Sequence, residues 1–310
     1  MFLKSVLGKF TYPLTHQLLQ MKNHLLKGIE QNRILAAQLL IQNMKEKAML
    51  DDIPQVEFKV FSQWGEDGII QYLINKIPVP NPVFVEFGVG DYSESNTRFL
   101  LMNNNWTGLI MDSDQDNINS VVASELYWQY DITAMQAFIT KENINQLVRN
   151  AGIGGDIGLL SIDVDGNDYW IWDSISDDVI SPRIVIVEYN SVFGKDLAIT
   201  IPYKIDFSRA VAHHSNLYYG ASLKALYLLA QKKGYIFVGS NSAGNNAFFV
   251  RKDVASVFRE YSIGDGYVES KFRESRDENG NLSFVKSGAR LNILKGQMVY
   301  DTEKNILVKL

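Results

Sequence analysis

Hydrophobic residues fall into short runs, and the most regular of these runs end on or next to an acidic residue. Residues 83–87 read Val-Phe-Val-Glu-Phe, residues 158–163 read Gly-Leu-Leu-Ser-Ile-Asp, and residues 183–188 read Arg-Ile-Val-Ile-Val-Glu. Short apolar runs rich in β-branched residues are typical of strands buried on both faces of a parallel sheet. Similar runs at 106–112 and 126–130 predict two further strands.

Helical patterns separate these strands. They begin at residue 97 and cover residues 140–151 and 169–176. Alternation of strands and helices predicts a parallel sheet with right-handed crossovers. A clear helix over 222–233, ended by Gly234, is followed by strand patterns at 235–239 and 247–251. These last two strands predict a hairpin that makes one strand at the sheet's edge antiparallel.

The two ends of the chain differ from this central pattern. Residues 14–50 contain no proline, and their apolar residues recur at steps of three and four, which predicts an amphipathic helix. Residues 1–47 hold seven Lys and Arg and two Glu, which gives this segment a net charge of +5. Since the whole chain has a net charge of −5, the remaining residues have a net charge of −10. We therefore expect an N-terminal helical segment over 1–57, a main domain over 58–254 and a small β-rich extension over 255–310.

The N-terminal helix has two interpretations. It packs on its own domain or on a second copy of the chain, which would make the protein a homo-oligomer. Alternatively it lies on a membrane surface, through apolar residues that stand beside two lysines. These are Phe2, Leu3, Val6, Leu7 and Phe10 with Lys4 and Lys9. No apolar run approaches the roughly 20 residues of a membrane span, and the N-terminus has no signal-peptide pattern.

Composition removes several function classes. Net charge is −5, which does not suit a general nucleic-acid-binding surface. The chain has no cysteine, so disulfides, thiolate zinc sites and a cysteine nucleophile are excluded. The lack of cysteine fits a reducing compartment, and we expect a cytoplasmic protein.

The turn after the first strand is the most informative motif. It reads Glu86-Phe-Gly-Val-Gly90, and Gly88 and Gly90 permit positive φ and close approach of a ligand to the backbone. A dinucleotide site needs a third glycine, and Ser93 stands at that position. An acid inside the turn suits a ligand with a cationic head, such as S-adenosylmethionine, better than a pyrophosphate.

Acids at the ends of the next two strands extend this site. Asp112 follows Gly88 by about 24 residues, the separation that places a carboxylate against ribose hydroxyls. Asp131, after the run at 126–130, would face an adenine amino group. Each acid has a plainer interpretation, as a helix cap or a strand-end residue.

Five motifs together resemble the FkbM-like branch of class I S-adenosylmethionine-dependent methyltransferases, over about residues 58–253. The chain has Asp165 where that family has Glu. The motifs are Ser62-Gln-Trp-Gly-Glu-Asp67, Glu86-Phe-Gly-Val-Gly90, Trp106-Thr-Gly-Leu-Ile110, Ser161-Ile-Asp-Val-Asp-Gly166 and Ile184-Val-Ile-Val-Glu188.

The resemblance implies a Rossmann-like, seven-stranded sheet of order 3-2-1-4-5-7-6 with strand 7 antiparallel. It also implies S-adenosylmethionine as cofactor and O-methylation of a sugar or other small hydroxylated acceptor, in surface-glycan or secondary-metabolite synthesis. By this resemblance, the cofactor's amino-acid end is held by Glu86, Gly88 and Gly90. Its ribose is held by Asp112, and its adenine by Asp131 and Ile132. Further cofactor contacts are expected from Gln63, Glu66, Asn96 and Asp163.

Polar side chains gather where strands four and five end. Asp163 and Asp165 follow the fourth strand, and Glu188 and Asn190 follow the fifth. Neighbouring parallel strands bring both sets to one edge of the sheet. Carboxylate and amide oxygens are suitable ligands for Mg²⁺, which would orient a substrate oxygen and lower its pKa. The plainer interpretation is that Asp163 only touches the cofactor.

Of two other interpretations of Asp163-Val-Asp165, the calcium loop fails and the glycosyltransferase motif remains. A calcium loop would need Gly at its sixth position and Glu at its twelfth, where the chain has Asp168 and Ser174. The Asp-x-Asp of metal-dependent glycosyltransferases also matches, but it leaves the glycine turn unexplained. A non-catalytic scaffold that docks a partner through the N-terminal helix is a third hypothesis for the whole protein.

The general base has several candidates. His213 and His214 precede a loop after strand five, where an acceptor pocket is expected, and a histidine of near-neutral pKa can take a proton. Asp163 and Asp165 are the alternatives. Arg273 in the tail is a candidate contact for an anionic acceptor.

Overall fold

The computed structural model describes residues 2–46 and 53–310, apart from the side chains of residues 2–14, 19, 23 and 46. The chain divides into two compact units, Met1–Ala48 and Met49–Leu310. In the first unit, α1 (Phe2–Glu46) is one continuous helix. It confirms the helix predicted over residues 14–46 and begins twelve residues earlier; residues 47–50 of that prediction lie outside the described residues.

The membrane-surface interpretation concerns side chains that the structure does not describe, so it stays a prediction. Over the described residues, no helix is both long and apolar enough to pass through a bilayer.

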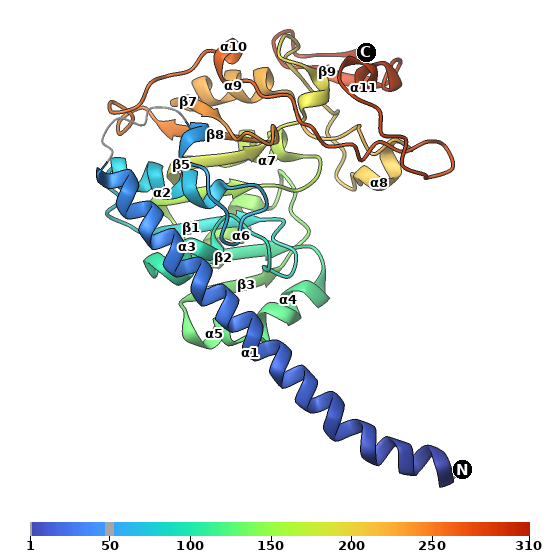
Figure 1. Ribbon diagram of the computed structural model, residues 1–310. Helices are drawn as coiled ribbons and strands as arrows, with labels where there is room; N and C mark the ends of the chain where they lie inside the picture. Colours follow the sequence, from blue (N-terminus) through green and yellow to red (C-terminus); the bar gives the residue numbers. More distant parts are fainter. Residues whose placement is uncertain (1, 47–52) are drawn as a thin grey trace. The chain divides into compact units, whose positions relative to one another are not determined.

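The second unit is built on a seven-stranded sheet of order β3-β2-β1-β4-β5-β8-β7 (Figure 1). The first five strands are parallel, and β8 runs antiparallel to both β5 and β7. Since β6 belongs to another sheet, this order confirms the expected 3-2-1-4-5-7-6. The strands are β1 (Val83–Phe87), β2 (Thr107–Asp112), β3 (Ile132–Gln136), β4 (Gly155–Ile162), β5 (Ile180–Glu188), β7 (Tyr235–Ser240) and β8 (Asn246–Arg251).

Helices cover both faces of this sheet, because alternate strand residues point to opposite sides. One face packs on α6, α7 and α9, with Trp172 buried against Phe249 at a ring-centroid distance of 5.0 Å. Helices α2 and α3 lie in front of the sheet in Figure 1. The helices are α2 (Glu66–Lys76), α3 (Arg98–Asn104), α4 (Gln115–Val122), α5 (Glu125–Gln129), α6 (Ile144–Asn150), α7 (Asp168–Ser174) and α9 (Leu223–Lys232).

The strand predicted over residues 126–130 is wrong. Residues 125–129 form helix α5, which contains no buried residue, and its Trp128 is 75% exposed. The aromatic run therefore lies on the surface, and the third strand is β3. Asp131 and Ile132 consequently lie where β3 begins and not where it ends.

The C-terminal extension is less rich in strands than expected. From residue 255 onward it has helices α10 (Ile263–Gly266) and α11 (Gly288–Ile293) and strands β9 (Met298–Asp301) and β10 (Ile306–Lys309). Strand β9 pairs with β10 and with β6 (Ile199–Thr200) in a second, three-stranded sheet. The remaining short helices are η1 (Ile53–Val56), η2 (Ser191–Phe193) and α8 (Arg209–Ala212).

Residues 267–275, here called the crossing segment, tie the extension to the main sheet. Tyr189 donates its hydroxyl to Val268 O at 2.6 Å, just beyond the end of β5. Arg290, only 3% exposed, donates to Ser270 O and to Glu269 Oε1, each at 3.0 Å. A Cβ on Gly244 would lie 2.7 Å from the backbone of residues 268–270. The crossing segment is therefore fixed tightly against the loop before β8.

Candidate functional site

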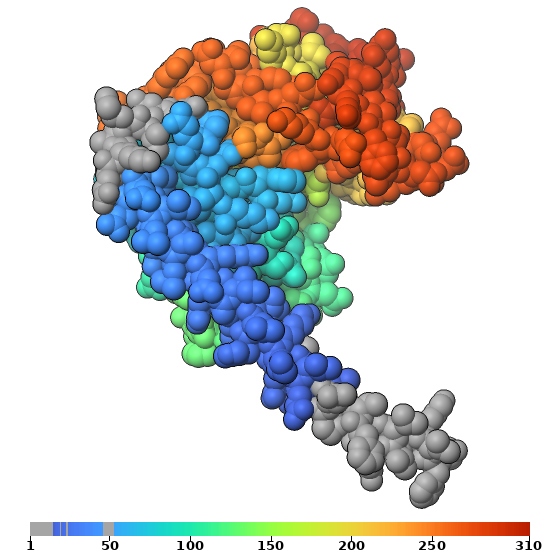
Figure 2. All heavy atoms as spheres, viewed as in Figure 1, coloured from blue at the N-terminus to red at the C-terminus, as the bar shows by residue number. Residues whose placement is uncertain are grey.

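A cavity of about 670 Å³ lies where the parallel strands end. Ligands of open α/β sheets bind at this edge, outside the carboxyl ends of the strands. Figure 2 shows the orange and red C-terminal residues overhanging the green residues of the middle of the chain. From the strands, the lining includes Gly88 and Gly90 after β1, Asp112 in β2, Phe138 and Ile139 after β3, Asp163 after β4 and Glu188 in β5.

The glycine turn is built against the acids of the neighbouring strands. Gly88 has φ +72°, and a Cβ there would lie 1.6 Å from the backbone oxygen of Asp163. Gly90 has φ +55°, and its N–H donates to Asp112 Oδ2 at 2.8 Å. Gly88 is thus required by geometry, since the close approach to Asp163 excludes a side chain, whereas at Gly90 only the positive φ favours glycine and a Cβ would meet no described atom within 4 Å.

Glu86 lies beneath this turn and is buried. Its carboxylate accepts from Asn96 N at 2.8 Å, from Thr97 N at 3.1 Å and from the Thr97 hydroxyl. Burial raises the pKa of Glu86 to about 7, against the opposing effect of these donors. Glu86 and Asn96 also line a smaller cavity of about 390 Å³ beside the glycine turn. The first role of Glu86 is therefore to hold the start of α3, and its contact with a cofactor stays a prediction.

Glu66 likewise serves the scaffold. Its Oε2 accepts from Trp64 N at 2.9 Å, and its Oε1 accepts from the amides of Asn241 and Asn246 at 2.7 and 2.8 Å. The loop before α2 is thereby pinned to the loop before β8. Gln63 and Trp64 of that loop line the large cavity, and Gln63 also lines the smaller one.

Asp67 fixes the same loop from below. Its Oδ2 accepts from Val60 N, Phe61 N and Ser62 N at 2.7 to 2.8 Å, and from the Ser62 hydroxyl. Burial raises the pKa of Asp67 to about 6. The acidic motif that precedes α2 is therefore a brace for the cavity wall.

Asp112 and Asp131, predicted to contact ribose and adenine, lie at opposite ends of their strands. Asp112 lines the cavity and accepts from Gly90 N and from Asp114 N, the latter at 2.8 Å. Asp131 accepts instead from the Thr107 hydroxyl at 3.0 Å, where β2 begins. The edge of β3 that faces the cavity is followed by Ala137, Phe138 and Ile139.

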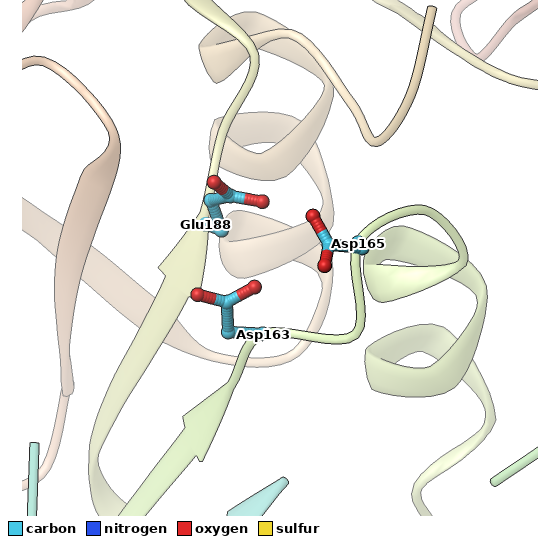
Figure 3. Close-up of side chains that lie close together, drawn as sticks. All are labelled: Asp163, Asp165 and Glu188. Atoms are coloured by element: carbon cyan, nitrogen blue, oxygen red, sulfur yellow. The ribbon is translucent and has the colours of Figure 1, made fainter. Parts of the chain in front are cut away.

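Three carboxylates converge at the ends of β4 and β5: Asp163, Asp165 and Glu188 (Figure 3). One oxygen from each can be chosen so that all lie within 4.8 Å of one another. Neither Asp163 nor Glu188 accepts a hydrogen bond from any residue that the structure describes, and Glu188 Oε2 is fully buried. Burial, followed by the neighbouring negative charges, raises the pKa of Asp163 and Glu188 well above the ordinary range.

Asp168, which follows this group in the chain, and Asn190, a predicted member of it, have structural tasks. Asp168 accepts from Val164 N and Gly166 N at 2.8 and 2.9 Å and so shapes the loop that carries Asp165. Asn190 donates to Leu217 O at 2.8 Å, and its oxygen accepts from Val192 N at 3.0 Å. The structure therefore does not bring the Asn190 oxygen into the carboxylate group.

The histidine pair lies elsewhere. The rings of His213 and His214 are 4.3 Å apart, and His213 Nδ1 is 2.8 Å from the Ser215 hydroxyl. Burial, helped by the neighbouring His214, lowers the pKa of His213. Neither histidine is among the residues that line the large cavity. Their role as general base stays a prediction without support from this placement.

Arg209 and Tyr219 are site residues that the sequence did not single out. Arg209 Nη1 donates to Asp165 at 2.9 Å, Nη2 pairs with Glu274, and the guanidinium lies 3.7 Å from the centre of the Tyr219 ring. Arg209 therefore links the acidic loop after β4 to the crossing segment. No motif surrounds it, so sequence reasoning had no signal to find it.

The crossing segment closes one side of the cavity with Phe272, Arg273 and Glu274. The rings of Phe272 and Trp64 are in contact, with centroids 4.7 Å apart. Trp64 stands inside a motif that the sequence did single out, whereas Phe272 lies about 200 residues further along the chain. Only the fold brings the two together.

No family model matches this chain, and no curated protein matches it. Among solved structures, it is similar to M. capricolum TrmK in complex with S-adenosyl-homocysteine, at 14% identity and TM-score 0.39, over 64% of this chain and 74% of that one. A Clostridium acetobutylicum S-adenosylmethionine-dependent methyltransferase matches at 8% identity and TM-score 0.39, over 70% and 98%. The N-terminal domain of EvdMO1, solved with SAH and D-fucose, matches at 8% identity and TM-score 0.38, over 69% of this chain and 94% of that one. These similarities are too distant to decide an activity.

Proposed function

We propose that this protein is an S-adenosylmethionine-dependent O-methyltransferase that acts on a sugar or another small hydroxylated acceptor. One observation carries the proposal. In a sheet of order β3-β2-β1-β4-β5-β8-β7, the glycine turn after β1 and the acids that end β2, β4 and β5 open into a single cavity. This placement is the one expected for a nucleoside cofactor at the carboxyl edge of a parallel sheet.

The charges that line the cavity favour a cationic ligand. Five carboxylates face two guanidinium groups, so the ammonium and sulfonium of S-adenosylmethionine complement the lining better than a nucleotide-sugar pyrophosphate does. The glycosyltransferase alternative would need a bound metal cation to offset these carboxylates before a pyrophosphate could enter. The charged lining residues are Asp112, Asp163, Asp165, Glu188, Glu274, Arg209 and Arg273.

Each part of the cofactor has a suitable surface. Its amino-acid end fits the bare backbone of Gly88 and Gly90, and its ribose fits Asp112. The adenine fits Phe138 and Ile139, whose apolar side chains follow β3 at the cavity edge. We therefore assign adenine contact to these two residues instead of Asp131 and Ile132.

The bound cofactor supplies an electrophilic methyl group. The acceptor's hydroxyl oxygen forms a bond to that methyl carbon while the carbon–sulfur bond breaks, and the hydroxyl proton must leave. Asp163 and Glu188 face the cavity without hydrogen-bond donors, and burial raises the pKa of each, so either carboxylate is suited to accept that proton. Positioning of the two reactants supplies much of the remaining acceleration.

Calorimetric titration tests the proposal. We expect micromolar binding of S-adenosylmethionine and S-adenosylhomocysteine, weakened about tenfold or more in Asp112→Asn, which loses a charge-assisted ribose contact. Asp131→Asn is the matched control and should bind as the unchanged protein does. Methyl transfer from labelled cofactor to free sugars and sugar nucleotides then defines the acceptor.

Two results would overturn the proposal. Binding of nucleotide-sugars alone, with divalent metal, would make Asp163-Val-Asp165 the centre of a glycosyltransferase. Failure of every ligand to bind to a folded protein would favour the scaffold role.

A further inference from the structure

We propose that Asp163, Asp165 and Glu188 bind a divalent metal cation inside the large cavity. The three side chains come from the ends of β4 and β5 and from the loop between β4 and α7, and their carboxylates turn toward a common point (Figure 3). The binding of the ion does not depend on the proposed function. What the ion does there, namely hold the acceptor oxygen, rests on it.

The spacing of the oxygens suits one ion. In octahedral coordination, two oxygens bound to the same cation lie about 3.0 to 4.2 Å apart for Mg²⁺ and about 3.4 to 4.8 Å apart for Ca²⁺. The three carboxylate oxygens lie within 4.8 Å of one another, which is at the upper end of this range. A small inward movement of Asp165, whose carboxylate is exposed, would close the set around Mg²⁺. Carboxylate oxygens are the ligands that both ions prefer.

The hydrogen bonding of Glu188 is the second, independent observation. Its Oε2 is fully buried and lacks any partner among the residues that the structure describes. A buried carboxylate without a donor is costly, and native proteins normally supply one. Asn167, which lines the same cavity, also has a buried oxygen with no described partner. A cation would both bind the Glu188 oxygen and offset its buried negative charge, whereas a neutral donor does only the first.

Arg209 is the only cation that contacts the group among the described residues, and it does not complete it. The guanidinium reaches Asp165 alone of the three, and it is held by Asn216 O at 2.9 Å and by Glu274. Its stacking on Tyr219 fixes it further. A metal ion and Arg209 would therefore compete for Asp165, and removal of the guanidinium should strengthen metal binding.

The ion would have a defined task beside the cofactor. It would coordinate the acceptor hydroxyl, orient it toward the methyl group and lower its pKa. The proton would then pass from this more acidic oxygen to the second carboxylate oxygen of Asp163 or Glu188, because each residue needs only one oxygen for the ion. The ion's coordination sphere would select acceptors that present oxygen to it. Acceptor recognition by this protein would then depend on the metal as well as on the cavity walls.

Metal binding is measured directly, without cofactor or acceptor, by titration of the metal-free protein with Mn²⁺ under electron paramagnetic resonance and with Mg²⁺ and Ca²⁺ by calorimetry. We expect one site per chain. Glu188→Gln and Asp163→Asn should weaken the affinity at least tenfold, and Arg209→Gln should strengthen it several-fold. Asp131→Asn, which also removes one acid but lies at the opposite end of the sheet from the cavity, is the control and should leave the affinity unchanged.

Absence of a Mn²⁺ site in the folded protein, or an affinity that Glu188→Gln leaves intact, would overturn the inference. Circular dichroism shows whether each variant is folded. Titration of the same samples with S-adenosylmethionine in chelating buffer separates the two proposals. If the protein binds the cofactor but no metal, only the metal-site inference is wrong. If it binds the metal but no cofactor, only the proposed function is wrong.

Discussion

Glu66 and Glu86 lie buried beside the cavity and receive hydrogen bonds from backbone or amide groups on both carboxylate oxygens. Asp67 receives three backbone N–H groups on a single oxygen. Asp163 and Glu188 lie at the edge of the same sheet, and no described residue donates to either. The first three, here called the bracing acids, therefore differ from the other two in what the fold provides for them.

This difference separates stability from function. Donors make the carboxyl oxygens of the bracing acids useful to the scaffold, because each acid organises a loop around itself. Among the described residues, the fold provides no hydrogen-bond donors for Asp163 and Glu188. An uncompensated buried charge costs several kcal/mol of stability. Such a cost is typical of sites where an external ligand completes the structure. Four predictions test this contrast.

The largest effect should come from Asp67. Asp67→Ala leaves three buried N–H groups without an acceptor, and we expect the free energy of unfolding to fall by about 4 kcal/mol. Asp67→Asn keeps one oxygen for these donors and should stay within about 1 kcal/mol of the unchanged protein. Urea denaturation measures both. Equal losses in the two variants would show that the charge, and not the acceptor oxygen, holds the loop.

The titration of Glu86 should make the free energy of unfolding depend on pH. Burial raises its pKa from 4.5 to about 7, so the folded state binds the proton more tightly than the unfolded state. The stabilisation that this tighter proton binding gives to the folded state is therefore fully present below pH 4.5 and is lost as the pH rises through 7. The free energy of unfolding changes by about 3 kcal/mol over this range. Glu86→Gln does not titrate, so its stability should fall less steeply between pH 5 and 8.

Denaturation of both proteins across this pH range gives the comparison. Buried acids that do not interact with Glu86 titrate alike in both proteins and cancel in the difference, whereas Asp67 and Asp163, whose charges interact with Glu86, change with it. Parallel curves would contradict the burial of an ionisable Glu86.

Glu188 should respond in the opposite direction. In chelating buffer, Glu188→Gln removes an uncompensated buried charge, and we expect the free energy of unfolding to rise by about 1 to 2 kcal/mol. Glu66→Gln is the matched control, because it disturbs a carboxylate that has donors and should lower stability. A loss of stability in both variants would remove the distinction between the two sets of acids.

The smallest effect concerns the wall that the bracing acids support. Trp64→Ala and Phe272→Ala should interact in a double-mutant cycle by about 1 kcal/mol, as an aromatic pair in contact does. Thermal or urea denaturation of the two single variants and the double variant gives this value. Additive losses would mean that the two rings do not stabilise each other and that the crossing segment is held by its other contacts.

Much of the sheet was predictable from the sequence. Apolar runs with acids at their ends predicted β1, β4 and β5, and the alternation of strands and helices predicted a parallel sheet. The order of the strands came from the family resemblance. The error at residues 126–130 has a plain cause, because an aromatic run looks like a strand whether or not anything packs on it. Trp128 is exposed, and no local sequence pattern predicts this exposure.

The site was predictable only where strand ends define it. Gly88, Gly90, Asp112, Asp163 and Glu188 line one cavity, as their places at the ends of parallel strands indicate. The sequence could not distinguish acids that brace from acids that are left without donors, since this depends on loops far apart in the chain. Arg209 and Phe272 reach the cavity through such long-range packing, and neither stands in a recognisable motif.

The crossing segment also has a consequence for the order in which the protein is made. Phe272 and Glu274 complete the cavity wall, and the segment that carries them is fixed by Arg290, whose buried side chain binds residues 269 and 270. On the ribosome, the whole seven-stranded sheet emerges before these residues do. A nascent chain can therefore form the sheet while its acidic cleft is still open on one side. The contacts between Arg290 and residues 269 and 270 can form only after Arg290 has left the exit tunnel, so this part of the cavity wall is secured after the sheet has emerged.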